Sequence, residues 1–199
     1  MRVLELFSGT HSVGKIAKEL GYEIVSLDLK GADINVDVLK WDYKIYRKDY
    51  FDMIWASPPC NTFSHLQIWR GDKTREQIQE NIDKFGLPIL RRTQDIIKYF
   101  EPELWFIENP QTGRMKEYMN DNYYDVDYCM YCDWGYRKRT RIWTNKINFN
   151  PKLCNKKCGN MVGNKHTITL GNSGTDKLNR NHRYRIPPNL IRELIIPQL

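Results

Sequence analysis

The 199-residue chain lacks any long hydrophobic run, and this absence narrows the class of protein. No apolar stretch approaches the roughly 18 residues that a membrane-spanning helix needs, and the mean hydropathy is −0.66. The first expected strand begins at Arg2, which leaves no room for a signal peptide. No internal repeat is visible. We therefore expect a cytoplasmic, intracellular protein with no membrane partner.

The chain has few cysteines and only a modest net charge, and both features restrict the kinds of site and partner that it can have. The five cysteines of an intracellular chain are better explained as a nucleophile or as metal ligands than as disulfides. Lys and Arg total 31 against 24 Asp and Glu, which gives a net charge of +7. This modest excess suits a polyanionic partner such as a nucleic acid, and equally a solvated surface. A hydrophobic content of 41% is enough for a folded core.

The order of apolar segments predicts an α/β fold with a Rossmann-like, doubly wound, mostly parallel sheet. Expected strands alternate with expected helices, and glycine or proline closes several of them. We expect one domain over residues 1–199. The expected strands cover residues 3–7, 23–27, 34–38, 52–56, 104–107, 123–131 and 141–144. The expected helices cover residues 15–20, 87–100 and 190–196.

Two segments have little apolar periodicity. Residues 62–84 are polar and are expected to form a mobile loop that leads into a helix. Residues 145–182 are rich in Asn, Lys and Gly, and they predict a loop-rich insert rather than a second domain.

A small-residue turn follows the first expected strand, and an acid ends the second. The turn runs from Ser8 through Gly9 to Gly14, and Asp28 closes the next strand. A carboxylate at that place can hold ribose hydroxyls. The turn has no Walker-type lysine–hydroxyl pair, so a triphosphate ligand is disfavoured. Asp37 is either a second ligand contact or an ordinary N-cap.

Two apolar strands deliver chemically useful groups to one edge of the predicted sheet. The first ends in Ser57-Pro58-Pro59-Cys60, and the second ends in Glu108-Asn109-Pro110. We predict that Cys60 is a nucleophile whose thiolate is favoured by backbone amides; the alternative is a packed cysteine. A buried Glu108 carboxyl can stay protonated and serve as an acid, or it can simply cap the strand.

Residues 135–143 predict a basic strand. Alternation places three guanidinium groups on one face, those of Arg137, Arg139 and Arg141. The opposite face carries Lys138, Thr140 and Ile142. The arginine face favours contacts to phosphates or bases, with a solvated surface as the alternative.

Four thiols have spacings typical of metal sites. They form Cys129-x-x-Cys132 and Cys154-x-x-x-Cys158, with His166 as an alternative ligand. Zinc is the natural ion for this set, and it would order the insert. The alternative is a group of reduced cysteines without metal.

Taken together, these motifs resemble the S-adenosylmethionine-dependent cytosine carbon-5 DNA methyltransferases, in the family's own order through most of the chain. Ser57-Pro58-Pro59-Cys60 resembles the nucleophile loop and is the most specific match. Glu108-Asn109 resembles the pair that contacts the target base, and Arg139-Thr140-Arg141 resembles the family's arginine strand. The resemblance assigns the S-adenosyl-L-methionine site to Phe7, Ser8, Gly9, Thr10, Asp28, Asp37 and Pro58. Ile186-Pro187-Pro188 resembles the late motif that returns to the cofactor pocket.

The resemblance implies a covalent mechanism on a flipped cytosine. Cys60 adds to ring carbon 6, Glu108 and Asn109 hold the base edge, and Arg139 and Arg141 grip the ring oxygen or a phosphate. Few residues remain where the family's recognition domain lies, so target recognition is expected to be reduced or supplied by a protein partner. A viral origin would place the enzyme in the host cytoplasm or nucleus. RNA methylation and a non-catalytic nucleic-acid-binding module are the alternatives.

Overall fold

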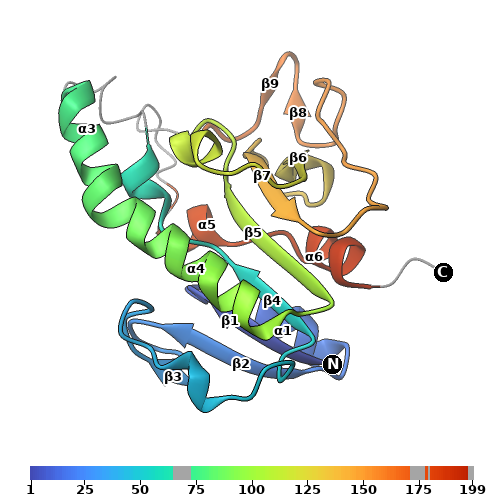
Figure 1. Cartoon of the computed structure of the whole chain (residues 1–199). Helices are drawn as coiled ribbons and strands as arrows, with labels where there is room; N and C mark the ends of the chain where they lie inside the picture. Colours follow the sequence, from blue (N-terminus) through green and yellow to red (C-terminus); the bar gives the residue numbers. More distant parts are fainter. Residues whose placement is uncertain (65–72, 171–177, 179, 197–199) are drawn as a thin grey trace.

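The computed structural model describes residues 1–64, 73–170, 178 and 180–196 (Figure 1). Its centre is a seven-stranded sheet of order β3-β2-β1-β4-β5-β7-β6. The first five strands in this order are parallel, and β7 and β6 extend the sheet antiparallel. This is the predicted Rossmann-like α/β class. The strands are β1 (Arg2–Leu6), β2 (Glu23–Asp28), β3 (Ile34–Asn35), β4 (Met53–Ala56), β5 (Leu104–Pro110), β6 (Tyr123–Asp127) and β7 (Arg139–Thr144).

Helices cover both faces of the sheet, as a parallel sheet requires. The 14-residue helix α4 matches the predicted limits at both ends, whereas α1 begins three residues earlier than expected. The helices are α1 (Ser12–Glu19), α3 (Arg75–Asn81), α4 (Leu87–Phe100), α5 (Arg180–Tyr184) and α6 (Pro188–Ile195). In the described part of the chain, no helix is both long and apolar enough to cross a bilayer.

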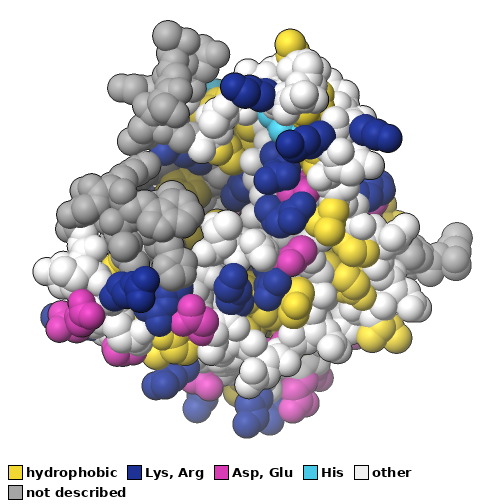
Figure 2. All heavy atoms as spheres, turned by 90° about the horizontal axis from the view of Figure 1, so that it is seen from above, with side chains coloured by type: hydrophobic (Ala, Val, Ile, Leu, Met, Phe, Trp, Pro, Cys, Tyr) yellow, Lys and Arg dark blue, Asp and Glu magenta, His cyan; other side chains and the backbone are white. Residues whose placement is uncertain are grey.

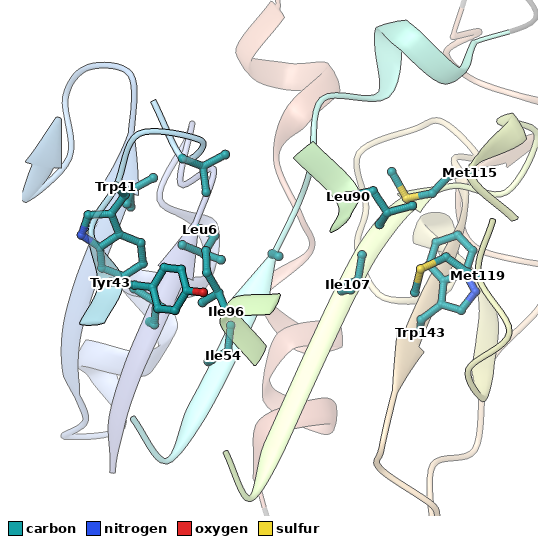
Figure 3. Close-up of a cluster of buried hydrophobic side chains, with 14 of the residues drawn as sticks. Leu6, Trp41, Tyr43, Ile54, Leu90, Ile96, Ile107, Met115, Met119 and Trp143 are labelled. Carbon is teal, nitrogen blue, oxygen red and sulfur yellow. The ribbon is translucent and has the colours of Figure 1, made fainter. Parts of the chain in front are cut away.

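Successive side chains along each strand point to opposite faces of the sheet, so apolar residues form two cores, one on each face. Leu6 and Ile54 point to the face covered by α4, where they pack with Ile96 (Figure 3). Val3 and Met53 point to the opposite face and pack with residues of α1 and α6. The four residues of β4 are all buried, which explains why its sequence is continuously apolar.

Several predicted boundaries are wrong, among them the strand expected over residues 34–38, which is only Ile34–Asn35. Residues 75–86 are helical: α3 begins with a capping box at Thr74 and Gln77 and continues through a π-helical turn, Ile82–Gly86, into α4. The rest of the predicted polar loop includes residues 65–72, which lie outside the described residues. The strand predicted over residues 123–131 ends at Asp127 and gives way to a 3₁₀ turn, Tyr128–Met130. Strand β5 continues through Pro110 because it pairs with β7.

The insert contains little regular structure where it is described. Its strands form one short antiparallel hairpin, β8 (Met161–Val162) with β9 (Lys165–His166). The Tyr131 hydroxyl group accepts a hydrogen bond from the Lys152 backbone at 2.9 Å. This bond connects the first part of the insert to the turn after β6.

Candidate active site

The predicted catalytic and cofactor residues gather at one edge of the sheet. Strands β1, β4 and β5 are parallel, so their carboxyl ends meet there. Figure 2 views the molecule from above Figure 1, the side toward which β4 and β5 run, and Lys and Arg side chains gather over part of this face. Such a face suits a polyanion.

The turn after β1 is shaped by a buried carboxyl group. Glu5 accepts hydrogen bonds from the backbone N–H groups of Val13 and Gly14, both at 3.1 Å. A Cβ atom on Gly14 would lie 2.7 Å from Glu5 Oε2, so a larger residue here would displace the Glu5 carboxyl group from the Gly14 backbone. Phe7 and Gly9 have φ of 59° and 46°, which reverse the chain within the turn. Burial raises the pKa of Glu5 to about 7, although the two N–H groups act in the opposite direction.

The predicted cofactor residues lie together around this turn. Asp28 at the end of β2 accepts a hydrogen bond from the Gly9 backbone at 2.9 Å. Ser8 is buried beside them, and its hydroxyl has no hydrogen-bond partner among the described residues. Asp37 lies two residues beyond Asn35, the register partner of Asp28. Its carboxylate accepts a hydrogen bond from the Leu39 backbone at 3.0 Å, so Asp37 caps a turn over residues 38–40 rather than a helix.

The late proline motif returns to the same turn. The Ile186 backbone donates a hydrogen bond to Ser12 Oγ at 3.1 Å, across 174 residues of sequence. Ser12 Oγ also lies 2.8 Å from Thr10 Oγ1. The segment that starts α6 therefore fixes the hydroxyl groups of the predicted cofactor turn.

Cys60 is half-buried at the start of a 3₁₀ turn, Cys60–Phe63, directly after the Pro58-Pro59 step. Burial raises the pKa of its thiol, the Lys138 ammonium group lowers that pKa, and the Glu108 carboxylate raises it. A backbone N–H group also lowers the thiol pKa, as expected, but desolvation is larger, so the pKa of Cys60 is raised overall. In the parallel register of β4 and β5, Ala56 faces Ile107, so Cys60 and Glu108 follow these two residues at the same edge of the sheet.

Glu108 is buried within β5 between two donors. Tyr128 donates its phenolic hydrogen to Glu108 Oε1 at 3.2 Å, and Lys138 Nζ lies 3.6 Å from the same oxygen. Lys138 also lies 4.8 Å from the centre of the Tyr128 ring. Complete burial and the Glu108 charge raise the pKa of Tyr128 well above its ordinary value, so its phenol remains a donor.

Asn109 connects the two strand ends. Its side-chain nitrogen donates a hydrogen bond to the Pro58 carbonyl at 2.8 Å. Its side-chain oxygen is buried and has no partner among the described residues. The prediction that Glu108 and Asn109 follow the strand is wrong, since both belong to β5, but they reach the expected edge.

The two motif arginines are held by aspartates of the neighbouring strand. Arg139 binds Asp127 at 3.0 and 2.7 Å, and Arg141 binds Asp125 at 2.7 and 2.8 Å. Arg141 faces Asn109 in the register, whereas Glu108 faces Ile142. Because directly opposed residues share a face, the arginines and Glu108 lie on opposite faces of the sheet. Arg137 is exposed and precedes β7, so the basic strand is shorter than predicted.

Three of the four cysteines predicted as metal ligands lie together, and His166 takes the place of Cys132. Cys129, Cys154, Cys158 and His166 have their ligand atoms within 4.8 Å of one another. Cys132 lies outside this group, and its thiol donates to the Tyr128 carbonyl at 3.1 Å. Cys129 lies within the 3₁₀ turn after β6 and Cys132 lies beyond it, so the two side chains point in different directions.

Sequence reasoning missed the roles of Tyr128, Lys138 and Glu5. Alternation already placed Lys138 on the face opposite the arginines, but no local signal showed that Glu108 shares that face. Glu5 sits in an apolar strand where a carboxyl group is unusual, and that oddity was the available signal.

Comparison with known proteins supports the resemblance. No family profile matches the chain. The chain is 48% identical over 211 residues to a "Probable DNA (cytosine-5)-methyltransferase" of Frog virus 3 (isolate Goorha), and the match covers 98% of this chain and 99% of that protein.

A solved structure shares the fold at low identity. The Entamoeba histolytica methyltransferase EhMeth is 14% identical with a TM-score of 0.54, over 77% of this chain and 55% of that one. The S. pombe Dnmt2 methyltransferase is 17% identical with a TM-score of 0.43, over 77% of this chain and 51% of that one. This chain therefore spans about half the length of the solved structures that it matches. On the near-complete match to the viral protein, the chain belongs to the DNA (cytosine-5)-methyltransferase family.

Proposed function

We propose that the protein transfers a methyl group from S-adenosyl-L-methionine to carbon 5 of a flipped DNA cytosine, through a covalent Cys60 adduct. One observation carries the proposal: Cys60 follows β4 and Glu108 lies near the end of β5, the neighbouring parallel strand, and the Asn109–Pro58 hydrogen bond joins the two strand ends. A thiol beside a carboxyl group is the pair needed to add a nucleophile to a pyrimidine ring.

The cofactor site is assigned to the turn after β1. The buried Ser8 hydroxyl and the Asp28 carboxylate offer polar atoms to a ligand there, and Asp37 lies at the next strand end. We assign Phe7, Gly9, Thr10 and Pro58 to the same site. When bound there, S-adenosyl-L-methionine supplies an electrophilic methyl group.

The reaction assigns one role to each catalytic group. The extruded cytosine enters the site, and the Cys60 thiolate forms a bond to carbon 6 while the ring electrons move toward carbon 5 and nitrogen 3. Glu108 enters the reaction in its protonated form and gives that proton to nitrogen 3, and the Tyr128 hydroxyl and Lys138 hold its carboxyl group in place. After carbon 5 has been methylated, a water molecule takes up the carbon-5 proton, and the electrons of that bond form the double bond to carbon 6. The bond from carbon 6 to Cys60 then breaks to release the thiolate, and nitrogen 3 returns its proton to Glu108.

Asn109 and the arginines act as supports in this scheme. Asn109 holds the loop that carries Cys60 through the Pro58 carbonyl. Arg139 and Arg141 are proposed to meet the base or a nearby phosphate with the N–H groups that Asp127 and Asp125 do not use.

We further propose that residues 1–199 act as one catalytic domain in which the insert, residues 145–182, replaces a recognition domain. The described part of the insert holds a single two-stranded hairpin. Sequence selection would then depend on the DNA itself or on a protein partner.

Covalent trapping tests the function directly. The protein is incubated with S-adenosyl-L-methionine and matched DNA and RNA oligonucleotides that carry 5-fluorocytosine. We expect a DNA adduct that resists denaturation and that Cys60→Ala abolishes. Cys132→Ser, which alters a cysteine outside the site, should leave the adduct unchanged. An adduct with RNA alone would identify an RNA methyltransferase, and binding of both without any adduct would identify a non-catalytic module.

A further inference from the structure

Four metal-binding side chains meet at the base of the insert, and none of them is among the residues assigned to catalysis. Cys129 comes from the turn after β6, Cys154 and Cys158 from the loop that follows β7, and His166 from β9. Cys129 and Cys154 are buried, and the other two are half-buried. Their ligand atoms all lie within 4.8 Å of one another.

The distances among the ligand atoms of Cys154, Cys158 and His166 fit one face of a tetrahedron, and Cys129 Sγ lies within 4.8 Å of all three. Cys154 Sγ lies 3.6 Å from Cys158 Sγ and 3.6 Å from His166 Nε2, and Cys158 Sγ lies 3.4 Å from the same nitrogen. For bond lengths of about 2.3 Å to sulfur and about 2.0 Å to nitrogen, the edges of a zinc tetrahedron measure about 3.8 Å between sulfurs and about 3.5 Å between sulfur and nitrogen. All five cysteines are free, and 3.6 Å is far longer than a disulfide bond.

We propose that Cys129, Cys154, Cys158 and His166 bind one structural zinc ion. Three thiolates and one imidazole make a closed, soft ligand set, which is typical of structural zinc rather than of a catalytic metal with an open position. The surrounding backbone supports the ligands: the Lys156 N–H donates to Cys154 Sγ at 3.3 Å. Asn160 donates its side-chain amide to the Cys129 carbonyl at 2.9 Å, which fixes the turn that carries this ligand.

The ion would fasten the insert to the strand pair that carries the motif arginines. The Cys154 backbone N–H donates to Asp127 at 2.8 Å, and Asp127 is the fully buried partner of Arg139. One residue therefore connects the metal site to the basic strand. The insert has few apolar residues of its own, so a metal supplies the folding free energy that a core would otherwise give.

The proposal stands independently of the catalytic one, and metal analysis tests it. Full-length protein is purified without a polyhistidine tag, and its zinc is measured by mass spectrometry. We expect about one zinc per chain in the wild-type protein and a loss of at least tenfold in Cys154→Ser and Cys158→Ser. Cys132→Ser is the matched control, because Cys132 lies three residues from a ligand yet points to the Tyr128 carbonyl. It should retain its zinc.

A second measurement covers the case in which the serine variants fail to fold. Cobalt(II) replaces zinc in the wild-type protein, and its absorption spectrum reports both the geometry and the thiolate ligands. We expect intense tetrahedral bands with sulfur-to-metal charge transfer, which should strengthen in His166→Cys. A folded wild-type protein without metal, an octahedral cobalt spectrum, or equal zinc loss from Cys132→Ser and Cys154→Ser would overturn the proposal.

Discussion

The side-chain amide of Asn109 donates a 2.8 Å hydrogen bond to the carbonyl oxygen of Pro58. This bond joins the end of β5 to the loop after β4, and so links the carboxyl group of Glu108 to the thiol of Cys60 through their neighbours in sequence. The position of the thiol therefore depends on a buried amide in another strand.

Asn109→Ala should weaken both the fold and the capture of substrate. It leaves the Pro58 carbonyl without its partner, which costs about 1–3 kcal/mol of unfolding free energy, and it frees the loop that carries Cys60. Urea unfolding and the rate of 5-fluorocytosine adduct formation measure the two effects. Asn145→Ala is the control: it removes hydrogen bonds to Trp105 and Glu103 far from the thiol, so adduct formation by the folded protein should be unchanged. Equal adduct rates in both variants would refute a positioning role for Asn109.

Lys138→Met should move the pH dependence of Cys60 toward alkaline pH. The ammonium group lowers the thiol pKa, so its removal reduces the thiolate fraction at neutral pH. A rise of one pKa unit would slow adduct formation about tenfold at pH 7. Rates of adduct formation between pH 6 and 10 show the displacement, and Lys138→Arg, which keeps the charge, should resemble the wild type. An unchanged profile in Lys138→Met would mean that the ammonium group has no influence on the thiol.

Glu108→Gln should retain cofactor binding while methyl transfer slows by about 100-fold or more, because the amide cannot supply the proton. Single-turnover transfer and calorimetric titration separate the two properties. Wild-type turnover by this variant would remove Glu108 from the chemistry.

Asp28→Ala should lose most of its affinity for S-adenosyl-L-methionine and remain folded. The carboxylate lies at the end of β2 and orients the Gly9 backbone. Isothermal titration calorimetry gives the affinity, and circular dichroism checks the fold. Asp33→Ala is the matched control, because Asp33 binds Ser26 on the same strand and should affect stability rather than the ligand. Equal affinity in Asp28→Ala and the wild type would exclude this aspartate from the cofactor site.

Glu5 should make the protein less stable as the pH rises toward 7. Its pKa is about 7 in the folded chain against an ordinary value of 4.5, so between these values the folded state binds more protons than the unfolded state. The contribution of Glu5 to the free energy of unfolding is fully present below about pH 4.5. It is lost as the pH rises through 7, and the total loss is about 3 kcal/mol. Urea unfolding at pH 5, 6, 7 and 8 should show a flatter pH dependence for Glu5→Gln than for the wild type. The exposed Glu23→Gln should follow the wild type, and parallel curves for all three proteins would contradict the assignment.

Local sequence determined the order of strands and helices and the edge at which the chemistry lies. The apolar period of residues 87–100 gave α4 within its observed limits, because one face of that helix must be buried. Alternation and closing prolines likewise placed Cys60 and Glu108 at the ends of neighbouring parallel strands. Each of these features depends on residues that are close in sequence, because the repeat of a helix or a strand determines which of them share a face.

Only the tertiary structure decided which side chains meet. The segment that leads into β7 placed Lys138 against Glu108, while Arg139 and Arg141 pair with aspartates of β6 on the opposite face. A 3₁₀ turn exchanged Cys132 for His166 in the thiol cluster. The Ile186 backbone reached Ser12 across 174 residues. These contacts join segments that are distant in sequence. Which contacts form depends on packing and desolvation across the whole fold, and a local sequence pattern contains no information about either.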